Sequence, residues 1–227
     1  MISLNNLHRC PDGLWRAPIL QAQPWLGHAF GTASTNPPGE LLELQQIHSA
    51  CVFECSEWHA ELEGDGLIVD RPGAAIAVKS ADCLPILLAD PVNRIAAAVH
   101  AGWRGTLAEL AARAVEKMTA VSGCRAGNII AAFGPSIRLC CFEVGPEVAL
   151  KFRPWFPEWD DLDRHAHIDL PEVNRRQLLS AGLLAERIAA GAPCTVCHPH
   201  SAGVQEFHSW RRDHKTGARM RSAIWLL

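Results

Sequence analysis

Residues 97–109, AAVHAGWRGTLAE, place a histidine at the junction between an apolar strand and a helix. Small apolar residues lead into His100, and a Gly-Trp-Arg-Gly turn follows. Thr106 and Glu109 then stand three residues apart as in a capping box, which predicts that a helix begins at Thr106. A histidine at a strand end beside a helix N-terminus is placed to hold a metal or to meet an anion. We take this corner as the point around which the rest of the chain is organised.

Composition excludes several function classes. The 227 residues, 48% of them hydrophobic, can bury a sizeable core. With 21 basic and 24 acidic residues the formal net charge is −3, so we expect no nucleic-acid partner and no membrane-binding basic patch. No apolar run approaches the ~20 residues that span a bilayer, and the N-terminus lacks a signal-peptide pattern. The nine cysteines are irregularly spaced, which favours a cytoplasmic protein with reduced thiols.

The pattern along the chain predicts a single domain over residues 1–227, because no repeat, low-complexity tract or linker is evident. Residues 1–45 are rich in Pro, Gly and Asn and predict an irregular N-terminal segment, with a surface loop over 31–40. Short apolar or alternating runs bounded by turn residues predict strands. These runs are 50–55, 66–70, 74–79, 85–89, 95–100, 128–133 and 223–227.

Two helices are predicted with more local detail. The first covers 106–120 and carries a Glu109–Arg113 pair on its outer face. The second begins after Asp169, where Pro171 suits the first turn, and ends at Gly182. The mixture predicts an α/β (α+β) fold with the sheet in the middle and few helices.

The segment 194–198, CTVCH, matches the C-x-x-C-H pattern of haem attachment. Haem attachment requires export, so a redox pair or half of a zinc site is the better chemical interpretation. No second C-x-x-C or H-x-x-x-H stands nearby in the sequence to complete four ligands. We therefore interpret Cys194 and Cys197 as two ordinary core cysteines.

Two other polar patterns have simple interpretations. The H-x-H triplets at 165–167 and 198–200 are too few for a copper cluster, so solvated loop histidines are expected. The basic segment 208–213, HSWRRD, joins an aromatic residue to an arginine pair. Such a pair binds phosphate or a base at some sites and forms salt bridges at a protein surface at others.

His48, Cys83 and His100 each stand next to a predicted strand end or turn, where a sheet exposes functional side chains. Two imidazoles and a thiolate suit Zn²⁺ and leave a fourth position for water or substrate. Zinc in such a site lowers the pKa of its water toward ~7. Three unrelated residues are the alternative, and spacing alone does not decide between the two.

Several separate motifs resemble one family. QIHS, DGLIVD, ADCLPILLAD, AVHAGWRG, GPSI…CFEVG and SWRRD…TGARM…IWL occur in the order seen in the bacterial multicopper polyphenol oxidase (laccase) domain family. Its members are also described as purine nucleoside phosphorylases with adenosine deaminase activity, or as peptidoglycan-editing factors. The resemblance implies a zinc enzyme with His48, Cys83 and His100 as metal ligands. It also implies a sandwich of central mixed sheets flanked by helices, similar to the chemotaxis receptor deamidase and cytotoxic necrotizing factor group.

The implied reactions are phosphorolysis of adenosine, inosine, guanosine and methylthioadenosine, and deamination of adenosine. Deamination needs a carboxylate to carry protons, and Asp82 and Asp65 are the candidates. Asp82 adjoins a ligand, but strand alternation can direct it to the opposite face. Phosphate needs N–H groups and positive charge, which the Gly102–Gly105 turn, Arg104 and the helix start at Thr106 offer. Arg211 is a second candidate for this contact.

One departure and several alternatives stay open at this point. The segment before Gln46 is shorter than in the family and lacks arginine, which puts any substrate contact made there in doubt. Cys83 is also suited to be the nucleophile of a metal-free hydrolase, with His100 or His48 as base. Three further hypotheses are a peptidoglycan-precursor hydrolase, a copper polyphenol oxidase with copper as its cofactor, and a non-enzymatic protein with structural zinc. We expect a monomer or a homodimer.

Overall fold

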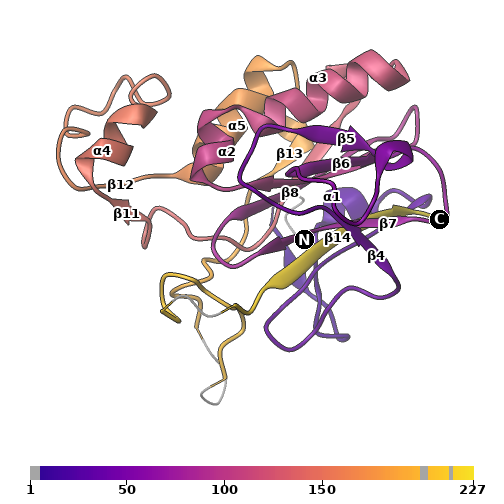
Figure 1. Cartoon of the computed structure of the whole chain (residues 1–227), viewed down its shortest axis with the longest axis horizontal. Helices are drawn as coiled ribbons and strands as arrows, with labels where there is room; N and C mark the ends of the chain where they lie inside the picture. Colours follow the sequence, from indigo (N-terminus) through magenta and orange to yellow (C-terminus); the bar gives the residue numbers. More distant parts are fainter. Residues whose placement is uncertain (1–5, 200–203, 215–216) are drawn as a thin grey trace.

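Two six-stranded sheets lie face to face in the computed structural model, which describes residues 6–199, 204–214 and 217–227 (Figure 1). The first has strand order β13-β10-β8-β9-β6-β5, and the second has order β1-β2-β3-β14-β7-β4. The first sheet comprises β5 (Val52–Glu54), β6 (Gly66–Val69), β8 (Leu84–Asp90), β9 (Ile95–Ala101), β10 (Ile130–Phe133) and β13 (Ile188–Ala189). The second comprises β1 (His8–Arg9), β2 (Trp15–Arg16), β3 (Leu26–Phe30), β4 (Leu41–Glu43), β7 (Ala75–Ser80) and β14 (Met220–Leu226).

Helices cover the outer face of the first sheet, and a smaller unit projects beside them (Figure 1). The covering helices are α2 (Trp103–Leu107), α3 (Leu110–Ser122) and α5 (Leu170–Ser180). The projecting unit contains β11 (Glu143–Val144), α4 (Pro146–Ala149) and β12 (Ala166–His167). The remaining helix α1 (Pro18–Gln21) precedes β3, and 3₁₀ turns occupy Cys55–Glu57, Ala126–Asn128, Leu150–Phe152 and Ala185–Arg187. No helix among the described residues is long and apolar enough to cross a membrane.

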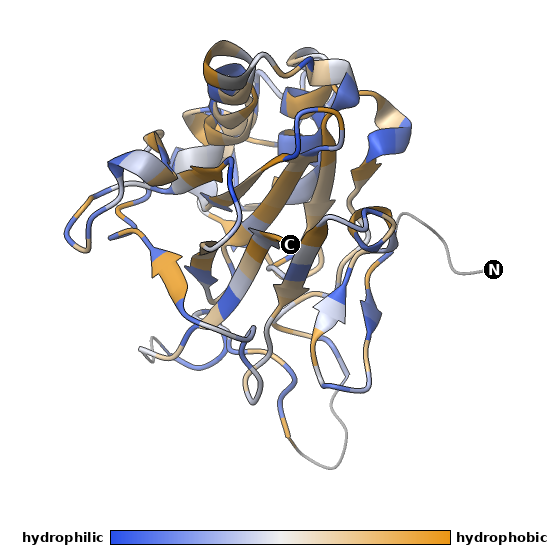
Figure 2. Ribbon diagram, turned by 90° about the vertical axis from the view of Figure 1, so that its right-hand side faces the viewer, coloured by the Kyte–Doolittle hydropathy of each residue, from blue (hydrophilic) through white to orange (hydrophobic). Residues whose placement is uncertain are grey.

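The central strands β8 and β9 are buried on both faces, and their side chains alternate between two cores. Ile86 and Val99 face the helices, whereas Leu87 and Ala98 face the second sheet. Figure 2 shows that the strands in the middle of the molecule are largely apolar. A third core packs the projecting unit against the start of α5. The predicted α/β class with central mixed sheets is confirmed, and all seven predicted strands are present.

The predicted helix over 106–120 is wrong in its start and in its continuity. Helix α2 begins directly after Gly102, and α3 begins after Glu109, whose φ of 59° breaks the helix in two. Thr106 is fully buried, and its Oγ1 accepts a hydrogen bond from Asn174 of α5, so the capping box does not form. The Arg113 guanidinium donates to the Ala108 carbonyl instead of pairing with Glu109. Tertiary contact with α5 therefore overrides the local signal.

The two other local predictions have opposite outcomes. Helix α5 starts as predicted, because the Asp169 carboxylate accepts the N–H of Glu172 at 3.1 Å, and Gly182 follows its end with φ of 98°. The expectation of an irregular segment over 1–45 is wrong, since β3 pairs with β14 along its whole length. Gly27 stands inside β3, and glycine lowers the strand propensity of this segment.

His28 makes the stability of this fold depend on pH. The side chain is buried, its Nε2 accepts the N–H of Ala17 at 2.9 Å, and burial lowers its pKa to about 3. In the unfolded chain the pKa returns to about 6.5, so acid protonates the unfolded state first. This histidine therefore destabilises the fold by up to about 1.4 kcal/mol per pH unit as the pH falls from about 6.5 toward 3.

We expect His28→Gln, which keeps an acceptor for the Ala17 N–H, to flatten the loss of stability between pH 6.5 and pH 4. Urea unfolding at several pH values measures the slope in both proteins. Identical slopes would show that the imidazole takes up a proton as readily in the folded protein as in the unfolded chain.

Candidate metal centre

Sheet register brings Asp65, His100 and Cys83 to one corner. His100 lies near the end of β9, and its N–H donates to the carbonyl of Asp65, the residue before β6, at 2.8 Å. Pro85 of β8 is the partner of His100 on the other side, and Cys83 precedes β8 by one residue. Alternation directs all three side chains to the face that meets the second sheet.

His48 reaches the same corner from the loop after β4. The side-chain amide of Gln46 holds this loop on β7 by pairing with both backbone groups of Lys79, at 2.8 and 2.7 Å. The N–H of His48 donates to the Asp65 carboxylate at 3.1 Å, and the residue adopts φ of 61°. The loop is therefore fixed at both of its contacts with the sheets.

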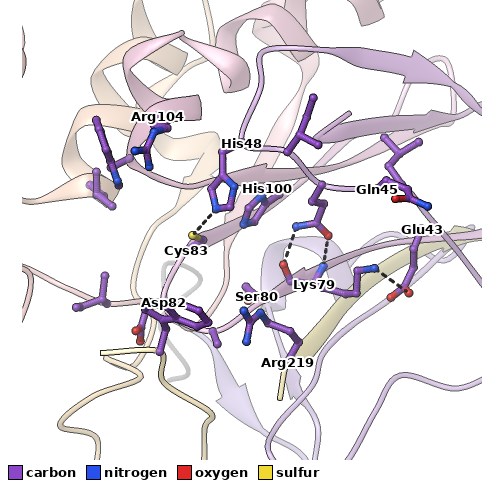
Figure 3. A pocket seen from close by; sticks show the side chains of 18 of the residues that line it. Glu43, Gln45, His48, Lys79, Ser80, Asp82, Cys83, His100, Arg104 and Arg219 are labelled. Atoms are coloured by element: carbon purple, nitrogen blue, oxygen red, sulfur yellow. Dashed lines mark hydrogen bonds and ion pairs between the residues drawn. The ribbon is translucent and has the colours of Figure 1, made fainter. Parts of the chain in front are cut away.

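The three side chains converge closely enough to share one ion (Figure 3). Their ligand atoms all lie within 4.8 Å of one another, and Cys83 Sγ is 3.9 Å from His48 Nε2. Gly102 allows this approach, since an added Cβ would lie 2.9 Å from His48 Cδ2 and 3.0 Å from Cys83 Sγ. Two imidazoles and one thiolate are a donor set that zinc accepts, so the residues fit the implied metal.

Asp65 orients the ligands from behind. Its carboxylate lies 2.8 Å from His100 Nδ1, which leaves His100 Nε2 as the nitrogen available to an ion. It also accepts the N–H and the hydroxyl of Ser49 at 2.6 and 2.8 Å, and it has no exposed surface. A carboxylate behind a histidine ligand is the usual outer shell of a metal site. We therefore assign Asp65 a positioning role and not the proton-carrier role considered from sequence.

The electrostatics of the site favour a thiolate. Burial opposes charge on Cys83, but the imidazoles of His100 and His48 lower the pKa of the thiol to about 6. Burial likewise disfavours a charged His100, but the Cys83 thiolate and the Asp65 carboxylate raise the pKa of His100 to about 9. The thiolate is the form that binds a metal and also the form that attacks an electrophile.

The cluster opens into a pocket of about 1000 Å³ between the sheets and the projecting unit. Aromatic side chains line it together with basic ones. These residues are Trp58, Trp103, Phe142, Trp210, Lys79, Arg104, Arg211 and Arg219. A flat heterocycle stacks well on such aromatic walls, and an anion is attracted by the arginines.

Residues 28–227 match the family described as multi-copper polyphenol oxidoreductase laccase. The chain belongs to this family. Among its relatives, a purine nucleoside phosphorylase from Deinococcus radiodurans is 34% identical over 92% of this chain and 78% of its own length. The purine nucleoside phosphorylase YfiH of Shigella flexneri is 35% identical over 86% of this chain and 77% of its own. The adenosine deaminase RL5 from an unknown prokaryotic organism is 40% identical over 70% of this chain and 66% of its own length.

The fold of this laccase-family chain is also that of a solved structure. The crystal structure of YlmD from Geobacillus stearothermophilus superposes with a TM-score of 0.83 over 98% of this chain and 99% of that one, at 23% identity. This likeness shows that the two chains share a fold.

Asp82, the predicted proton carrier, lines the pocket next to Cys83, and both of its carboxylate oxygens already accept hydrogen bonds. Its carboxylate points away from the Cys83 thiol (Figure 3) and accepts the Thr195 hydroxyl at 2.6 Å and the Arg211 N–H at 2.7 Å. Both oxygens thus serve to join the Asp82 turn to two distant loops. The geometry favours a positioning role for this residue in the laccase-family site.

The predicted phosphate-binding residues differ in whether their donor groups are available at the pocket. Arg104 is exposed at the pocket and lies over the Trp103 ring at 4.1 Å. Arg211 also lines the pocket, but its guanidinium donates to the carbonyls of Cys141 and Glu143. The cradle expected at Thr106 is wrong, because its N–H donates to the Gly102 carbonyl inside α2.

The other predicted patterns separate into two groups. The arginine pair of 208–213 is structural at Arg212, which forms an ion pair with Asp213 and donates to backbone carbonyls. Neither H-x-H triplet joins a group of three metal-ligating side chains within the described part of the chain, and His200 lies outside that part. The interpretation of Cys194 and Cys197 as ordinary core cysteines is wrong in two respects: Cys197 is exposed, and Cys140 and Cys141 lie beside the pair. The adjacent cysteine pair at 140–141 was the available signal.

Proposed function

We propose that this chain is a zinc-dependent purine nucleoside phosphorylase that also deaminates adenosine. The observation that carries the proposal is the His48–Cys83–His100 cluster, oriented by Asp65 and open to an aromatic, arginine-lined pocket. The names of the relatives support the same chemistry. The proposed substrates are adenosine, inosine, guanosine and methylthioadenosine with inorganic phosphate, and the proposed location is the cytoplasm.

The chain's own residues divide the work of the proposed reaction. The indoles of Trp58 and Trp103 offer surfaces on which a purine stacks. The guanidinium of Arg104 attracts phosphate, whose oxygen attacks ribose C1′ while the bond from C1′ to the base breaks and the base takes up a proton. Asp65 keeps the His100 ring in place throughout. Zinc, when bound, supplies a Lewis acid that lowers the pKa of water and polarises substrate oxygens.

The test is a product assay on purified protein of known metal content. We expect inosine to release hypoxanthine only when phosphate is present, and adenosine to yield inosine without phosphate. Chelation of the metal should stop both reactions, and zinc should restore them, with copper as the comparison metal. Release of base that does not depend on phosphate, or no release at all, would contradict the phosphorylase proposal.

A metal-free cysteine hydrolase is the second candidate, and the position of the Cys83 thiol beside the imidazoles of His48 and His100 is the observation that favours it. The two candidates differ in their response to chelation and alkylation. A hydrolase that uses the thiolate would retain activity after the metal is removed and lose it on treatment with iodoacetamide. A peptidoglycan precursor, offered as substrate in the same assay, tests the editing alternative.

Arg104 provides a prediction about phosphate. Its guanidinium lines the pocket and forms no ion pair within the described residues. We therefore expect Arg104→Ala to raise the KM for phosphate about tenfold with little change in kcat. Arg104→Lys should recover part of the loss. Arg71→Ala, at an exposed arginine outside the pocket lining, is the matched control. An unchanged KM for phosphate would remove Arg104 from the binding site.

A further inference from the structure

Two loops outside the first cluster bring four cysteines together. Ser136 pairs with Cys194 in an isolated bridge, and the Thr195 N–H donates to the Ser136 carbonyl at 3.0 Å. This pairing sets the turn that carries Cys140 and Cys141 against the turn that carries Cys194 and Cys197. All four sulfur atoms lie within 4.8 Å of one another.

We propose that Cys140, Cys141, Cys194 and Cys197 form a tetrathiolate zinc site separate from the His48–Cys83–His100 centre. Four thiolates complete the tetrahedral shell of a structural zinc site, with Zn–S distances of about 2.3 Å and sulfurs about 3.8 Å apart. Cys140 Sγ and Cys197 Sγ are 3.4 Å apart. A disulfide requires about 2.05 Å, so this pair is not bonded.

The sulfur of Cys194 has the surroundings of a metal thiolate. Backbone N–H groups of Val196 and Cys197 face it from its own turn, and one from Arg138 faces it from the other loop. Such N–H groups stabilise negative charge on a sulfur that cannot be solvated. Cys194 is buried, whereas Cys140 and Cys197 are exposed, so an ion can enter from the solvent side.

The position of the cluster gives the proposed ion a structural task. Thr195, inside the C-x-x-C turn, donates its hydroxyl to Asp82, next to the ligand Cys83. Arg212 donates to the Thr195 carbonyl, and Arg211 donates to the Cys141 carbonyl beside the pocket. An ion bound by the four thiols therefore fixes the two loops that support one wall of the pocket. The site does not depend on which reaction the pocket performs.

Metal stoichiometry tests the site directly. The full chain is purified from zinc-supplemented medium under reducing conditions, and zinc per chain is measured by mass spectrometry. We expect two zinc ions in the wild type, one in Cys83→Ala, one in Cys194→Ser/Cys197→Ser and none in the combined variant. Cys10→Ser, at a cysteine outside both clusters, should retain two.

Cobalt gives a second measurement on the wild-type cluster itself, in case the double variant fails to fold. We expect Co²⁺ added to metal-free Cys83→Ala to produce the intense sulfur-to-cobalt charge-transfer bands of a tetrathiolate. The proposal would be overturned if Cys83→Ala bound neither zinc nor cobalt. It would also be overturned if a free-thiol count fell two short of the number of cysteines, because that result indicates a disulfide. Iron in place of zinc would overturn the identity of the metal. A wild type that holds two zinc ions and turns over no nucleoside would count only against the proposed function.

Discussion

Replacing Cys83 by alanine should remove zinc from the His48–Cys83–His100 centre and lower phosphorolysis and deamination by about 10³-fold or more, which is about 4 kcal/mol of transition-state stabilisation. Two imidazoles alone form a weak site, because the thiolate supplies the negative charge and the softest donor. Cys83 also lies beside both histidines, so its loss removes the contact that draws their rings together. Zinc content and product release measured on the same sample check this result.

The control for this variant is Cys10→Ala, which removes a thiol outside both cysteine-containing clusters. It should keep the activity and the zinc content of the wild type. Equal product traces from the wild type and Cys83→Ala would end the zinc nucleoside hypothesis. Loss of activity in Cys83→Ala together with full activity of the chelated wild type would instead establish the metal-free hydrolase.

Local sequence patterns predicted the strands better than the helix near His100. β8 and β9 are short, apolar and bounded by turn residues, and nothing in the fold competes with that signal. Thr106 carried an equally good capping signal, yet Asn174 and Gln177 of α5 bind its hydroxyl and its carbonyl. Those partners lie about 70 residues further along the chain, so no local window contains them.

The candidate site divides in the same way. His48, Cys83 and His100 were named from strand ends, donor chemistry and family motifs, and the structure brings their ligand atoms within 4.8 Å. The proximity of Cys140 to Cys194 is not predictable from the spacing of metal ligands, because such spacing relates residues within one segment. The bridge between Ser136 and Cys194 that joins them is a tertiary contact. Sequence spacing detects a ligand pair, whereas assembly of two pairs requires the fold.

The role of Asp65 also required the fold, because its partners come from two segments, the loop 47–49 and strand β9. Its two oxygens accept hydrogen bonds from His100 Nδ1, from the Ser49 hydroxyl and from the backbone N–H groups of residues 47–49. The histidine and Ser49 bonds lower the pKa of this carboxyl despite its burial. It is therefore an acceptor on both oxygens, a role that an amide cannot fill, since the NH₂ group of asparagine would face donors.

We therefore expect Asp65→Asn to weaken zinc binding at the first centre about 10- to 100-fold and to lower the free energy of unfolding by about 2–4 kcal/mol. Competition with a zinc chelator measures the affinity, and urea unfolding measures the stability. Asp90→Asn is the matched control, because Asp90 is equally buried and accepts N–H groups of residues 92 and 93 in the β8–β9 turn, away from both clusters. It should lose stability and keep zinc affinity. If both variants lose stability and neither loses zinc affinity, Asp65 supports the loop without orienting His100. Only a residue that orients a metal ligand should lower zinc affinity in addition to stability.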